Sequence, residues 1–225
     1  MNVTTSQPGT STRLRIAAGL VLLVQAVALV VVLLTHGTSL LLPVITTAGS
    51  ASFTVTTVNV AVGAIVPVAL GALAFLTSTA VDRRARWIES SLSSSITVFL
   101  IAELNGIREL AALVAIYALT SAAVLFAVVQ QGRTTRPRML PASFGAAVGI
   151  VPWGLIAWYE IAPVVAGMTG PAAWVRVMTV VVLALFVSAA VLVWRGMGGS
   201  RAAAILRVVT RSAVAWGVVS AVLLL

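Results

Sequence analysis

The chain has 225 residues, of which 60% are hydrophobic and 8% charged, and its mean hydropathy is +1.13. This composition excludes a water-soluble fold, because a soluble domain needs far more polar side chains to cover its surface. The net charge of +9 does not indicate a nucleic-acid partner, since the basic residues fall between apolar segments and not on one face of a soluble element.

The residue types also exclude several kinds of chemistry. The chain has no cysteine, which excludes thiolate catalysis, cysteine metal ligands and disulfides. Its one histidine, His36, has no cluster of further ligands with which to complete a zinc site. No nucleophile with an adjacent base and no phosphate-binding loop is evident in the sequence, so we expect neither an enzyme nor a metal. All basic residues are arginine, and the codon bias of a GC-rich bacterial genome can explain the absence of lysine.

Taken in chain order, the apolar runs predict seven transmembrane helices. A helix that crosses a hydrocarbon layer of about 30 Å needs about 20 mostly apolar residues, so the chain has room for about seven crossings. After a short polar cytoplasmic tail (1–13), we expect one transmembrane domain (14–225). The predicted spans are residues 14–35, 54–80, 85–106, 110–130, 142–164, 173–194 and 202–225. The predicted fold class is an all-α, multi-pass bundle in the bilayer of the cell (plasma) membrane.

The first outer connection, from His36 to Ala51, is the longest. A stretch rich in Thr and Val follows it, and this composition predicts a short β-ribbon.

The arginines predict the orientation of the bundle, with the N-terminus in the cytoplasm and the C-terminus outside. Basic segments near helix ends resist translocation and contact anionic lipid on the cytoplasmic face. In this orientation the outer connections contain only Arg108 and Arg176. The cytoplasmic segments contain Arg13, Arg15, Arg83, Arg84, Arg86, Arg133, Arg136, Arg138, Arg195 and Arg201.

Two further arginines, Arg207 and Arg211, lie inside the last predicted span. Charges within a span are costly and usually face the bundle interior, where they pair with other polar groups. Because these two are four residues apart, they share one helix face with Thr210. Arg207 can reach back toward the cytoplasmic surface, whereas Arg211 lies near the midplane and needs an anion.

The third predicted span offers that anion in Glu89, about one turn inside its basic start. We expect Glu89 to pair with Arg207 or Arg211, and Ser93 and Thr97 continue the same helix face outward. Gln25, near the middle of the first span, is expected to join this polar seam. One interpretation is a structural ion pair that fixes helix packing, and the other is a functional polar site.

Several other residues within or near the ends of the predicted spans also have expected roles. Trp153 and Trp216 fall deep within their spans and are candidates to line an interior cavity. Gly145 and Gly149 form a G-x-x-x-G pattern, which permits close helix contact and is weak evidence of dimerisation. The remaining residues near the outer helix ends are expected to form a solvated charge cluster. These residues are Glu103, Arg108, Glu109, Glu160 and Arg176.

Three stretches of the sequence resemble the heliorhodopsin family. RWIESSLSSSITVFLIAELNGI (Arg86 to Ile107) is similar to the third helix of that family, GIVPW (Gly149 to Trp153) to the fifth, and TRSAVAW (Thr210 to Trp216) to the last. The resemblance implies a rhodopsin-like seven-helix bundle and a homodimer. It also implies an N-terminus inside, opposite to other microbial rhodopsins, which agrees with the orientation argued from the arginines.

The resemblance assigns roles to three residues and also meets a chemical obstacle. It makes Glu89 the counterion of a protonated retinal Schiff base, places Arg211 at the retinal lysine, and puts Arg207 where the family has a small polar residue. A Schiff base needs an amine that can lose its proton, whereas a guanidinium stays protonated. Covalent retinal is therefore not expected, and histidines of the family's first two helices are missing as well.

The leading functional hypothesis is a retinal-free, heliorhodopsin-like membrane protein that has a regulatory or sensory role. It would act through a membrane or cytoplasmic protein partner whose identity the sequence leaves open. One alternative is a transporter or channel for a small anion, with Arg207 and Arg211 as the binding pair. Another is a carrier of a noncovalent apolar ligand such as a carotenoid or retinoid.

Overall fold

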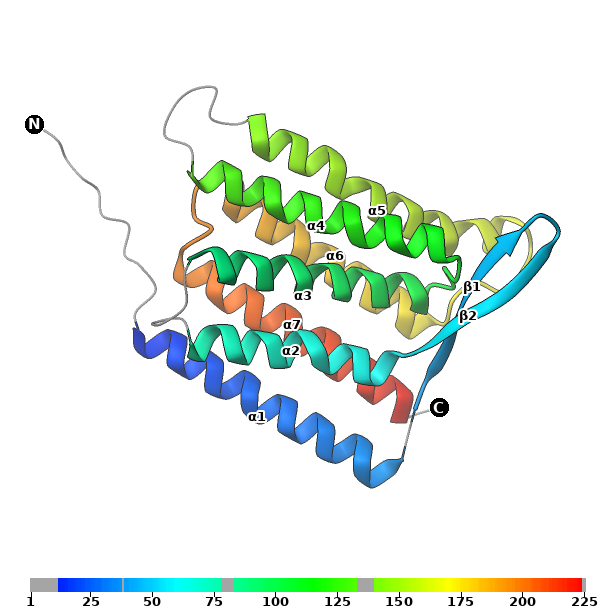
Figure 1. The fold of residues 1–225 in the computed structure, drawn as a ribbon, viewed down its shortest axis with the longest axis horizontal. Coiled ribbons are helices and arrows are strands. Elements are labelled where there is room, and N and C mark those ends of the chain that lie inside the picture. Colours follow the sequence, from blue (N-terminus) through cyan, green and yellow to red (C-terminus); the bar gives the residue numbers. More distant parts are fainter. Residues whose placement is uncertain (1–11, 38, 78–82, 133–139, 224–225) are drawn as a thin grey trace, which may run out of the picture.

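The computed structural model describes residues 12–37, 39–77, 83–132 and 140–223, which form a helical bundle with a β-hairpin at one end (Figure 1). Most of the predicted polar tail lies outside the described residues, as do Asp82 and the arginines predicted for the segment 133–139. The described helices are α1 (Thr12–His36), α2 (Val60–Leu76), α3 (Arg83–Leu104), α4 (Leu110–Gly132), α5 (Leu140–Val165), α6 (Ala173–Trp194) and α7 (Arg201–Leu223).

The helices have the length and composition of membrane spans, with two exceptions. Among the described residues, α1, α4, α5, α6 and α7 are long and apolar enough to cross a membrane. Helix α2 is apolar but has only 17 residues. Helix α3 has 22 residues but is rich in Ser and contains charged side chains, which lowers its hydropathy. The polar side chains of α3 are sheltered by its neighbours, because α3 packs against both α2 and α4.

The connection between α1 and α2 is a β-hairpin, which confirms the expected β-ribbon and adds two strands to an otherwise helical fold. Strands β1 (Leu41–Ala48) and β2 (Ala51–Asn59) pair in antiparallel register, and Gly49 has the positive φ of 63° that the tight turn requires. Hydrophobic and β-branched residues make both segments good strands. The second predicted span therefore starts too early, since residues 54–59 belong to β2.

Helix α2 begins at the end of this hairpin with a side-chain cap. The Oδ1 atom of Asn59 accepts a hydrogen bond from the backbone N–H of Val62 at 3.2 Å. This bond satisfies one of the N–H groups that the first turn of a helix leaves without a partner. Pro67 lies inside α2 and is buried, as expected for a proline tolerated by neighbouring helices.

The order of packing positions the interior residues. Each helix from α1 to α5 packs against the next, and α7 packs against α1, α2 and α6. Helices α3 and α7 are not close backbone neighbours. A side chain that joins them must therefore be long and must pass α2.

The G-x-x-x-G pattern of α5 faces α4 within the same chain. A Cβ atom added at Gly145 would lie 2.9 Å from Cβ of Phe126, and one added at Gly149 would lie 3.2 Å from Cβ of Ala123. The two glycines thus allow α4 and α5 to approach closely. This intramolecular role accounts for the pattern without a second copy of the chain.

Candidate functional site

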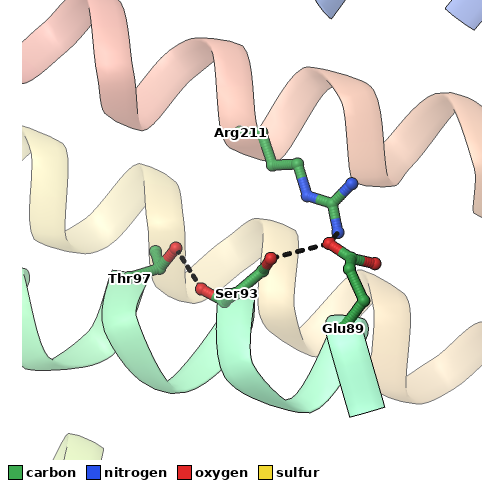
Figure 2. Close-up of polar contacts among 4 residues, drawn as sticks. All are labelled: Glu89, Ser93, Thr97 and Arg211. Atoms are coloured by element: carbon green, nitrogen blue, oxygen red, sulfur yellow. Dashed lines mark hydrogen bonds and ion pairs between the residues drawn. The ribbon is translucent and has the colours of Figure 1, made fainter. Parts of the chain in front are cut away.

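The centre of the site is an ion pair between α3 and α7. Nη2 of Arg211 donates to Oε1 of Glu89 at 2.5 Å (Figure 2). Arg211 is the eleventh residue of α7, and the side chains of Arg211 and Glu89 are only 7% and 15% exposed. Two charges at this depth need each other, because loss of either partner strands the other in a medium of low dielectric constant.

Ser93 and Thr97 extend the ion pair along α3. Oγ of Ser93 donates to the same Oε1 atom of Glu89 at 2.7 Å, so this oxygen accepts from both a hydroxyl and a guanidinium. Thr97 is one turn further, and its hydroxyl donates to the backbone oxygen of Ser93 at 2.8 Å (Figure 2). The structure therefore places these predicted residues on one face of α3, with Thr97 satisfied by its own helix.

Arg211 reaches Glu89 by passing over a glycine of α2. A Cβ atom added at Gly71 would lie 2.1 Å from Nη1, 2.8 Å from Cζ and 3.0 Å from Cδ of Arg211. No side chain larger than hydrogen fits there unless Arg211 moves. This role has no signal in the sequence, because a glycine in an apolar helix has no signature of its own and only the packing of α2 against α7 shows what it faces.

Gly71→Ala is accordingly expected to displace the Arg211 side chain and lengthen or break its bond to Glu89. Breaking a buried ion pair costs about 3–5 kcal/mol, and some of that loss should appear in thermal unfolding. The matched control is Gly154→Ala in α5, where an added Cβ has no neighbour within 4 Å. The assignment of Gly71 would be wrong if both variants unfolded at the same temperature as the native protein.

The hydrogen bonds of Gln25 and Thr210, two other predicted members of the polar seam, are made to residues other than Glu89. Gln25 accepts a hydrogen bond from Ser212 at 2.7 Å, which ties α1 to the residue after Arg211. The hydroxyl of Thr210 donates to the backbone oxygen of Leu206 at 2.8 Å, within α7. Arg207 is partly buried one turn before Arg211. Of the two candidate arginines, the structure pairs Arg211 with Glu89.

The two candidate pocket aromatics differ in position. Trp153 is partly buried and meets Phe186 edge to face, with ring centroids 5.6 Å apart. Trp216 is 38% exposed on the outside of the bundle, so its expected place in an interior cavity was wrong. Five residues of helix correspond to a rotation of about 140°, so Trp216 faces away from the buried Arg211.

The charged residues at the hairpin end of the bundle do not form the expected solvated cluster. Glu103 is fully buried, Arg108 is partly buried, and only Arg176 is exposed. Glu109 binds the hairpin, since its carboxylate accepts from the backbone N–H of Thr47 at 3.3 Å and from the Thr47 hydroxyl at 3.0 Å. The β-hairpin contacts this end of the bundle through Glu109, and of these charged residues only Glu103 is fully buried.

A shallow apolar groove lies between α1 and α7. Its volume is about 210 Å³, below the roughly 300 Å³ at which ligand pockets begin. The groove is lined by Leu14, Ala17, Ala18, Val21, Ala204, Ile205, Val208 and Val209. It is therefore a poor candidate for binding a whole carotenoid or retinoid.

The model of the heliorhodopsin family matches residues 12–223, which include both strands of the hairpin and all the helices described above. No curated protein sequence matches the chain.

Proposed function

The chain belongs to the heliorhodopsin family, and from this premise we propose that it is a retinal-free member that regulates or senses through protein partners in or at the membrane. The observation that carries the proposal is the ion pair between Arg211 and Glu89. The family resemblance places Arg211 at the retinal lysine and Glu89 at the counterion, and the ion pair joins these two positions.

These residues do not fit a covalently bound retinal. The guanidinium of Arg211 donates to Glu89 and keeps its proton, and the 225 residues contain no lysine that could replace it. Arg211 provides a permanent cation beside Glu89, in the place where a protonated Schiff base would be. We propose that the protein is thereby fixed in one charge state and does not respond to light through this site.

The row of polar side chains along α3 ends at Thr97, and this argues against ion conduction through this part of the bundle. Beyond Thr97, the next residues on the same face of α3 are Leu100 and Ile101, three and four positions further, which are 1% and 0% exposed. Arg211 is also already neutralised by Glu89. These two features favour a static structural or signalling role over anion transport, and we propose contacts with a partner protein, together with a homodimer, as the route of action.

Purification tests the retinal-free state. Protein produced in cells supplied with all-trans retinal is expected to show no visible absorption band and no retinal oxime after treatment with hydroxylamine. A visible band that bleaches with hydroxylamine would contradict the proposal.

In-cell photo-crosslinking from the exposed hairpin and from the α6–α7 connection tests for protein partners. Crosslinks to a second copy of the chain alone would leave the homodimer as the functional unit.

We also propose that the N-terminus is cytoplasmic and the hairpin external. The native chain has no cysteine, so single cysteines report topology without background. Ser39, beside the hairpin, and Gly199, between α6 and α7, are both exposed, and an added Cβ at Gly199 meets nothing within 4 Å. An impermeant maleimide should label Ser39→Cys in intact cells and Gly199→Cys only after lysis. Labelling with the opposite sidedness would invert the topology.

A further inference from the structure

A second buried polar site lies at the hairpin end of α3. Glu103 is 0% exposed, and both its carboxylate oxygens are buried without a hydrogen-bond partner among the described residues. A buried carboxylate without such partners is strongly unfavourable, because burial removes the water that would solvate it. Something other than the described protein groups must therefore satisfy it.

Two further side chains at this end of the bundle, those of Asn105 and Arg108, also have a buried polar atom without a hydrogen-bond partner among the described residues. Asn105 is 3% exposed, and its Nδ2 donates at 2.8 Å both to the backbone oxygen of Ile101 and to the hydroxyl of Thr179. Its Oδ1 atom is nevertheless buried and unpaired within the described part of the chain, and so is Nη1 of Arg108. Asn105 lies two residues after Glu103, and Arg108 lies three residues after Asn105, so all three belong to the hairpin end of α3 and the connection that follows it.

Glu103 and Arg108 attract each other without direct contact. No salt bridge joins Glu103 and Arg108 in the described part of the chain, in contrast to Glu89 and Arg211. Burial lowers the pKa of the Arg108 guanidinium, and the negative charge of Glu103 opposes that effect. The two charges are thus close enough to interact and too far apart to bond.

The hairpin closes this region from the outside. The backbone oxygen of Arg108 accepts from the N–H of Ile45 in β1 at 2.9 Å, where the strand pairing has a bulge. The next residue, Glu109, holds Thr47. The bonds of Ile45 and of Thr47 in β1 are thus both made to the short α3–α4 connection, which contains Arg108 and Glu109.

We propose that ordered water occupies this region and bridges Glu103, Asn105 and Arg108 as a solvent-separated ion pair beneath the hairpin. A water molecule donates to the oxygens of Glu103 and Asn105 and accepts from the N–H of Arg108, so it alone satisfies both kinds of orphan atom. Buried waters characteristically make about three hydrogen bonds to such groups. A bound metal cation would satisfy the oxygens but would be repelled by the guanidinium.

Solid-state NMR on the native protein in lipid vesicles tests the site, because the chain has only four glutamates. With ¹³C in the glutamate carboxyl groups and ¹⁵N in the arginine guanidinium groups, Glu89 should show strong dipolar dephasing from Arg211. Glu103 should show much weaker dephasing. Glu103→Gln identifies its signal by removing one of the four carboxyl resonances.

Magnetisation transfer from water provides the second measurement. The Glu103 signal should build up from water about as fast as that of Glu109, which lies at the surface of the hairpin contact. The backbone carbonyl of the fully buried Leu100 is the dry control. Dephasing of Glu103 as strong as that of Glu89 would mean a direct ion pair, and transfer as slow as at Leu100 would mean a dry site. Either result would overturn the proposal.

Discussion

Glu89→Gln is expected to destabilise the protein by about 3–5 kcal/mol, because it removes the negative charge that neutralises Arg211. The glutamine can still accept from Ser93 and from the guanidinium, so the hydrogen-bond geometry at 2.5–2.7 Å is largely retained. The loss therefore reports the charge and not the shape of the site. Thermal unfolding of purified protein in detergent, followed by circular dichroism, measures it.

Two further variants separate this effect from a general loss of packing. Glu109→Gln changes a carboxylate that binds the hairpin at the protein surface, where ion and hydrogen-bond effects are about 0–1 kcal/mol. The double variant Glu89→Gln with Arg211→Met removes both charges and should be more stable than Glu89→Gln alone. An unchanged unfolding temperature for Glu89→Gln would show that water solvates Arg211, and the anion-binding alternative would gain.

The membrane helices could largely be predicted because each is a long apolar run, and hydropathy sums over such runs regardless of packing. Reliance on hydropathy also explains why the second span was predicted to begin at residue 54, whereas α2 begins at Val60. Residues 54–59 are β-branched or otherwise compatible with a strand, and their hydropathy alone does not distinguish a strand of the hairpin from the first turn of a helix. Asn59 marks the true boundary, since it caps α2.

A pairing of Glu89 with an arginine of α7 was predictable because a charge in a span demands a partner. The choice between Arg207 and Arg211 was not, since the two lie on one helix face a single turn apart. The structure decides it through Gly71, whose missing side chain leaves the path along which Arg211 crosses α2. That contact joins residues 140 positions apart in the chain and has no local signal.

The burial of Glu103 was beyond sequence reasoning for a different reason. Counting residues along α3 places Glu103 near the outer end of the helix, where water is normally available. The hairpin folds back over this end and seals it through Ile45 and Arg108. A connection that covers a helix end has no hydropathy signal, so a residue predicted to be solvated is instead fully buried.

Introduction of a lysine at position 211 is expected to produce a visible retinal pigment only when Arg207 is replaced as well. Arg211→Lys alone supplies an amine, but Arg207 one turn away disfavours the protonated Schiff base, so absorption should shift toward the near ultraviolet. Arg207→Ser combined with Arg211→Lys removes that repulsion and leaves Glu89 as a counterion. The double variant, purified with all-trans retinal, is expected to absorb visible light.

The missing side chain of Gly71 supports this expectation, because it leaves space beside position 211. Lysine is narrower than arginine at its end, so it leaves unfilled the space over Gly71 that Nη1 and Cζ of Arg211 occupy. Adding Glu89→Gln to the double variant should shift the visible band, because the charge beside the Schiff base is lost, whereas Glu109→Gln should not. A folded double variant that takes up no retinal would show that side chains fill the former chromophore cavity or that position 211 is not the lysine equivalent. In the first case, the proposed absence of retinal from the native protein would depend on the packing of its interior and not only on the arginine at position 211.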